Sequence, residues 1–66
     1  MTLEELQILV AKAIEIYGPG VPVLARSQRS WMADVQAIYF EKSQMHMVMS
    51  ADAAEFEGDE DYEQIV

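Results

Sequence analysis

The stretch TLEELQILVAKAIEIYGPG, residues 2–20, decides the N-terminal half of the fold of this 66-residue chain. Thr2 and Glu5 have the spacing of a capping box, in which each side chain bonds the other residue's backbone amide. Gly18-Pro19-Gly20 ends the helical pattern. Between these signals, apolar residues recur at steps of three and four and share one helical face; they are Leu3, Leu6, Leu9, Val10, Ala13, Ile14 and Tyr17. The sequence therefore predicts an amphipathic helix over residues 3–17.

Three stretches after the helix have strand character. Residues 21–26 are short, and Pro22 favours a sheet edge because it has no amide hydrogen. Residues 31–40 fit both a strand and a helix, and the aromatic and β-branched residues toward the end favour a strand. Residues 41–44 have hairpin length, and residues 45–50 alternate as a second strand. Residues 62–66 are a candidate for a short edge strand at the end of the chain.

These elements predict an α+β fold. One N-terminal amphipathic helix packs on a small, mainly antiparallel three-stranded sheet and forms a two-layer domain. We expect residues 1–50 to be this single domain. Residues 51–66, called the acidic segment below, are expected to be a C-terminal tail that is partly disordered or ends in an edge strand.

Charge is distributed very unevenly along the chain. The formal net charge is −8, and residues 1–50 carry five acidic and four basic side chains. The acidic segment carries the other seven acidic side chains and no basic one. This excess disfavours direct binding to nucleic acid, because phosphate contacts need Lys and Arg. The lack of cysteine excludes a disulfide scaffold, and the apolar runs are far shorter than the ~20 residues that span a bilayer.

The candidate partner-binding residues all lie in the acidic segment. A row of carboxylates has the charge to occupy the basic cleft of a nucleic-acid-binding protein, as a DNA mimic does. In an extended segment, alternate acidic residues would line one side at steps of ~6–7 Å, and Phe56 and Tyr62 would anchor the docked segment. The candidates are Asp52, Glu55, Phe56, Glu57, Asp59, Glu60, Asp61, Tyr62 and Glu63. The alternative interpretation is a solvated tail that only keeps the protein soluble.

Catalytic and metal sites find little support in the sequence. Met45, His46, Met47 and Met49 are side-chain types that bind Cu(I). Alternation along a strand, however, points the methionines to one face, where they fill gaps in the core, and His46 to the other. Carboxylates in a solvated tail lack the pocket that shifts a catalytic pKa. We therefore expect no enzyme, no cofactor and no metal site.

The motifs Thr2-Leu3-Glu4-Glu5-Leu6, Gly18-Pro19-Gly20 and Val21-Pro22-Val23, followed by a hairpin, give the chain a family resemblance. Over residues 2–50 it resembles small accessory proteins encoded by phages and prophages, with a "T-x-x-E-L" helix, a Gly/Pro turn and "VPV". That resemblance implies an α+β accessory protein. It supplies no catalytic residues. Members of this broad class include inhibitors of host proteins, some of them acidic DNA mimics.

The function predicted from these observations is non-enzymatic protein binding. The chain is expected to act as a phage-type inhibitor that binds a basic, nucleic-acid-binding host protein through its acidic surface. The alternative is a structural or assembly protein that forms a homodimer, since a core this small gains stability from a partner. The expected location is the cytoplasm, that of a bacterial host cell if the chain is phage-encoded.

Overall fold

The computed structural model describes residues 1–25 and 33–66 and contains one helix and a mixed sheet. Helix α1 spans Leu3–Tyr17, and the strands are β1 (Val23–Ala25), β2 (Ala37–Glu41), β3 (His46–Ser50) and β4 (Tyr62–Gln64). The strands are ordered β1-β3-β2-β4 across the sheet. The α+β class is confirmed, but the sheet has four strands where the sequence predicted three.

Helix α1 begins and ends where the sequence predicts. The Thr2 hydroxyl accepts a hydrogen bond from the Glu5 amide at 3.2 Å, and the Glu5 carboxylate accepts one from the Thr2 amide at 3.3 Å. The helix stops at Gly18, whose φ of 94° lies in a region that side-chain-bearing residues rarely adopt. The Gly18 amide still donates to the Ile14 carbonyl at 2.8 Å. The capping box and the glycine stop are therefore both present.

Strands β2 and β3 form the predicted hairpin, with shifted boundaries. They pair antiparallel, with Tyr39 opposite Val48 and Glu41 opposite His46. Met45, expected to begin the second strand, lies in the turn with φ 56°, and its amide donates to the Glu41 carbonyl at 2.9 Å. Residues 37–40 of the ambiguous stretch 31–40 are a strand, which continues into Glu41 of the expected connection, and residues 33–36 are neither strand nor helix. Trp31 and Met32 lie outside the described residues.

Strand β1 lies at one edge of the sheet and pairs parallel with β3. Val23 is opposite Met47, and Leu24 is opposite Val48. The Met47 amide donates to the Pro22 carbonyl at 2.8 Å, so Pro22 joins the ladder as an acceptor only. The edge position predicted for this proline-containing strand is therefore confirmed. The expected strand extended to Arg26, which lies outside the described residues.

The acidic segment supplies the fourth strand. Strand β4 pairs antiparallel with β2 at the other edge, and the Ile65 amide donates to the Ile38 carbonyl at 3.0 Å. The short edge strand proposed for residues 62–66 is thus present over Tyr62–Gln64. The sheet that the sequence predicted with three strands thus gains a fourth from residues 51–66, for which an edge strand was one of the two expected forms.

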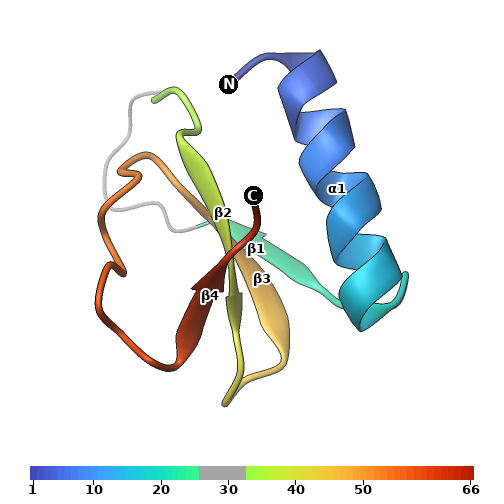
Figure 1. Cartoon of the computed structure of the whole chain (residues 1–66). Coiled ribbons are helices and arrows are strands. Elements are labelled where there is room, and N and C mark those ends of the chain that lie inside the picture. The colour runs from blue at the N-terminus through green and yellow to red at the C-terminus, as the bar shows by residue number, and fades with distance from the viewer. Residues whose placement is uncertain (26–32) are drawn as a thin grey trace.

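The sheet is covered on both faces, which makes three layers (Figure 1). On one face, Ile38, Phe40, Met47 and Ile65 form a cluster against which α1 packs Leu6, Leu9, Ala13 and Tyr17. On the other face, Ala37, Tyr39 and Val48 pack with Phe56 and the half-buried Tyr62. Figure 1 shows residues 51–61 looping along the side of the sheet opposite α1. Successive residues of β2 therefore face α1 and residues 51–61 in turn, as strand geometry requires.

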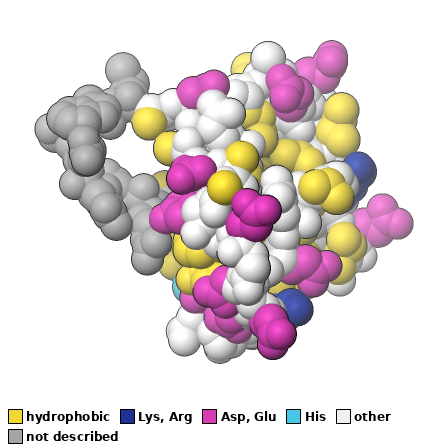
Figure 2. All heavy atoms as spheres, turned by 60° about the vertical axis from the view of Figure 1, so that its left-hand side comes forward, with side chains coloured by type: hydrophobic (Ala, Val, Ile, Leu, Met, Phe, Trp, Pro, Cys, Tyr) yellow, Lys and Arg dark blue, Asp and Glu magenta, His cyan; other side chains and the backbone are white. Residues whose placement is uncertain are grey.

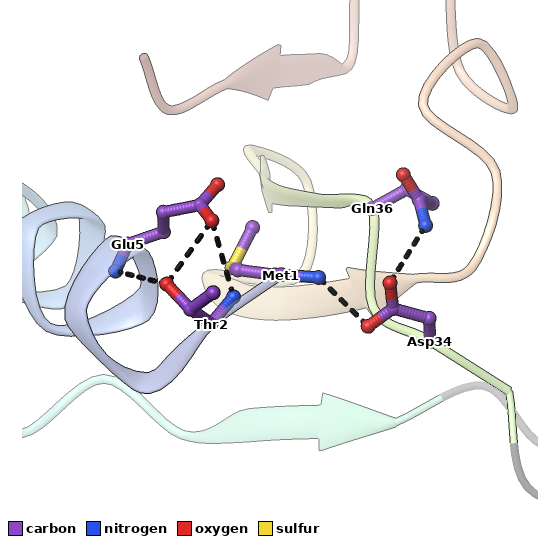
Figure 3. Close-up of polar contacts among 5 residues, drawn as sticks. All are labelled: Met1, Thr2, Glu5, Asp34 and Gln36. Carbon is purple, nitrogen blue, oxygen red and sulfur yellow. Dashed lines mark hydrogen bonds and ion pairs between the residues drawn. The ribbon is translucent and has the colours of Figure 1, made fainter.

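The start of α1 is tied to the residues that lead into β2 (Figure 3). The amino nitrogen of Met1 donates to Asp34 Oδ1 at 2.7 Å, and Gln36 Nε2 donates to Asp34 Oδ2 at 3.1 Å. The hydrogen bond and the positive charge of the Met1 amino group lower the pKa of the Asp34 carboxyl. This exposed contact links the residue before the capping box to the segment that leads into β2.

Candidate protein-interaction surface

Residues 52–62 of the acidic segment are folded into consecutive tight turns. The amides of Glu55, Glu57 and Asp59 donate to carbonyls three residues earlier, at 3.2, 3.1 and 3.1 Å. Gly58 has φ 82°, a conformation that glycine adopts without a steric penalty. The expected row of carboxylates along an extended strand is therefore wrong, because the turns spread these side chains around a compact loop.

Phe56 and Tyr62 attach this loop to the sheet. Phe56 is 9% exposed, stacks on Tyr62 with ring centroids 3.8 Å apart, and meets Tyr39 edge-on at 5.1 Å. Burying an aromatic side chain stabilises a fold by about 1.5–3 kcal/mol, and aromatic pairs add to this. In this structure the Phe56 ring is enclosed in the protein's own core, so its expected contact with a partner stays a prediction.

Several carboxylates of the segment have structural roles within it. Asp61 accepts hydrogen bonds from the Ser43 amide at 2.9 Å and the Ser43 hydroxyl at 2.6 Å, which joins the loop to the β2–β3 turn. The carboxylates of Asp52 and Asp59 each accept a hydrogen bond from the amide two residues later, at 2.9 and 3.0 Å. Aspartate favours turns for this reason. Part of the charge run is thus explained by turn formation.

Glu57 and Glu60 differ from these aspartates, because both residues are exposed. Figure 2 looks toward this side of the molecule and shows acidic side chains spread over the face among apolar ones, with few basic side chains. The pKa of Tyr39 reflects the same charge: burial raises it, and the carboxylates of Asp52, Glu57 and Glu55 raise it further. The loop therefore presents negative charge on a backbone that its turns fold and Phe56 attaches to the sheet.

A polar cluster joins three strands next to this loop. The Glu41 carboxylate contacts His46 Nε2 at 2.5 Å and accepts a hydrogen bond from the Tyr62 hydroxyl at 2.5 Å. Glu41 is opposite His46 in β3 and opposite Tyr62 in β4, so the sheet register brings the three together. No short sequence pattern predicts this cluster, because its formation depends on the fourth strand. The cluster lines a hollow of about 280 Å³ beside Phe56.

The methionine and histidine stretch is divided between the two faces, as its alternation predicts. Met47 is buried in the cluster beneath α1, while His46 lies with Glu41 and Tyr62 on the other face. Met45 is 62% exposed in the turn and is therefore not a core residue. Within residues 1–25 and 33–66, no three His, Cys, Asp or Glu side chains are grouped to hold a metal ion.

The same described ranges contain no helix that is long and apolar enough to cross a membrane. The chain matches no family model. Comparisons with curated proteins and with solved structures likewise give no match. The resemblance to phage and prophage accessory proteins therefore stays a prediction from residues 2–50.

Proposed function

We propose that this chain is a non-enzymatic protein-binding module that docks on a basic protein surface through residues 52–61, called the acidic loop below. The observation that supports the proposal is the burial of Phe56, which attaches a highly charged loop to the rigid sheet. Carboxylates held in this way lose little conformational freedom on binding, and preorganisation of this kind favours affinity. A merely solubilising tail has no need of such an attachment.

The partner class that fits this charge is a protein built to bind nucleic-acid phosphates. Such a protein has a basic surface, and complementary charge accelerates encounter and sets specificity more than it sets raw affinity. The carboxylates available for this contact are those of Glu57 and Glu60, together with the rest of the acidic loop. In this proposal the chain competes with nucleic acid for its partner, as an inhibitor that mimics DNA does. The mimicry rests on charge density, since the loop has no strand-like spacing.

The experiment must remove charge without removing the fold. Deleting residues 51–66 would also delete β4 and the buried Phe56, so loss of binding by that variant would be uninformative. Glu57→Gln/Glu60→Gln removes two exposed carboxylates from the loop. Glu4→Gln/Glu15→Gln removes two exposed carboxylates from α1 and is the matched control, because both variants have the same net charge.

Each immobilised protein is incubated with nuclease-treated bacterial lysate in low-salt and in high-salt buffer, and the captured proteins are identified. We expect basic nucleic-acid-binding proteins that are released by salt and displaced by added duplex DNA. Exposed charge pairs contribute about 0.2–1 kcal/mol each, so the loop variant should bind the purified partner about 2- to 30-fold more weakly than the control. Equal binding by the two variants, or captured proteins that are not basic, would overturn the proposal.

A further inference from the structure

An apolar patch lies on the side of the molecule where α1 meets β1. Its members are Val10, Ile14, Val21, Val23 and Met49, and they surround a hollow of about 150 Å³. Val10 is 41% exposed, Ile14 47% and Val23 55%. No charged side chain is found among the described residues that line the hollow. The patch is therefore an uncharged, apolar surface on a chain of net charge −8.

Within residues 1–25 and 33–66, the outer backbone edge of β1 has no strand partner. Because the Pro22 carbonyl accepts the Met47 amide, Pro22 and Leu24 direct their backbone groups toward β3. Alternation then directs the amides and carbonyls of Val23 and Ala25 outward. No described strand lies beyond β1, which is the end member of the sheet order. This edge is apolar, whereas the other edge, β4, carries Glu63 and Gln64.

The outward groups of β1 are arranged symmetrically about Leu24. A twofold axis at Leu24 sets two β1 strands antiparallel, so that Val23 of each copy exchanges both backbone hydrogen bonds with Ala25 of the other. Twofold interfaces require such self-complementary surfaces. A strand of three residues is too short for a stable interface by itself. A standard interface buries about 800 Å² per partner, which is about one sixth of the 4897 Å² surface of this chain, so α1 must contribute.

The charge distribution indicates which molecule docks on the apolar patch. Two copies of this acidic chain repel each other wherever acidic surfaces meet, and the uncharged patch is a surface on which they meet without that cost. A basic partner, in contrast, is attracted to the acidic loop and gains no charge pairing at the patch. We infer that a second copy of this chain docks here, with the β1 strands paired across a twofold axis and the exposed apolar side chains of α1 and β1 packed between the copies.

Sedimentation over a range of protein concentrations tests this inference. Ile14→Glu places a charge inside the patch, and Ile8→Glu places the same charge on another side of α1, where the side chain is similarly exposed (51% for Ile8, 47% for Ile14). The wild type and Ile8→Glu should approach twice the 7.5 kDa mass of one chain as concentration rises. Ile14→Glu should remain a monomer with an unchanged circular dichroism spectrum.

Amide hydrogen exchange of the wild type provides a readout that needs no variant. The amides of Val23 and Ala25 should exchange more slowly as concentration rises, while the amide of the exposed helix residue Glu15 near the end of α1 should keep one rate. The inference would be overturned if the wild type stayed monomeric at the highest concentration. It would also be overturned if the exchange rates of the Val23 and Ala25 amides did not change with protein concentration. Loss of the dimer in both glutamate variants would also overturn it, because the contact would then not be confined to the patch.

Discussion

Two layers cover the sheet, α1 on one face and the acidic loop on the other. Their residues are buried to different extents, and the difference is the opposite of what their compositions suggest. Helix α1 is rich in apolar residues, yet none of its residues is buried, and Ile16 is 61% exposed. The acidic segment is dominated by charge, yet it places Phe56 and Ile65 in the core at 9% and 5% exposure. How deeply each layer is buried against the sheet therefore depends on individual side chains more than on average composition.

The largest expected effect is that of Phe56→Ala. Truncating a buried phenylalanine typically costs about 3–5 kcal/mol, which is about the whole stability that a core of this size supplies. Phe56→Ala should therefore lose its cooperative urea transition, monitored by circular dichroism. Ile16→Ala, on the apparently more hydrophobic layer, should change the free energy of unfolding by no more than about 0.5 kcal/mol. Equal effects of the two variants would remove the contrast between the layers.

A smaller effect is expected at the contact between the loop and the β2–β3 turn. Asp61 accepts two hydrogen bonds from Ser43, and bonds to charged groups contribute about 1.5–3 kcal/mol when they are shielded from water. Because this contact is largely exposed, Asp61→Ala should lower the free energy of unfolding by about 1–2 kcal/mol. Glu60→Ala removes a neighbouring carboxylate and should stay within about 0.5 kcal/mol. A shift in the urea midpoint for Glu60→Ala as large as that for Asp61→Ala would mean that general repulsion, not this contact, controls the loop.

The smallest effect concerns the exposed contact that holds the start of α1. The pKa of Asp34 is lowered in the fold by the Met1 amino group. This contact therefore stabilises the fold fully at pH values above the ordinary aspartate pKa. That stabilisation is lost as pH falls through the lowered pKa. Melting temperatures measured from neutral to strongly acidic pH should fall more for the wild type than for Asp34→Asn. Parallel curves for the two proteins would show that the contact does not contribute to stability.

The local elements of this fold were predictable from the sequence because their signals are local. Thr2, Glu5 and Gly18 act within one or two turns of α1, and the turn before His46 joins strands that are adjacent in the chain. Strand β4 and the parallel pairing of β1 with β3 depend on contacts between distant residues, which no short pattern encodes. Residues 62–66 had strand character, but their partner in β2 did not follow from it.

The candidate site was predicted in composition and missed in shape. Seven acidic side chains after residue 50 predicted a charged surface, and the exposed Glu57 and Glu60 fit that prediction. The loop is attached to the sheet by Phe56, and the composition did not indicate this, because one phenylalanine hardly changes the average composition of a charged segment. Asp52 and Asp59, each followed two residues later by the amide it binds, are the signal from which turns were predictable.

Hydrogen exchange of the Ile65 amide tests the central claim, that the acidic segment is a folded layer of this protein. That amide donates to the Ile38 carbonyl at 3.0 Å, and the Met47 amide donates to Pro22 within the other half of the sheet. If the segment is part of the fold, the two amides should be protected to a similar degree, since both open with the sheet. Exchange of Ile65 at the rate of an unstructured chain, beside a protected Met47, would contradict the account.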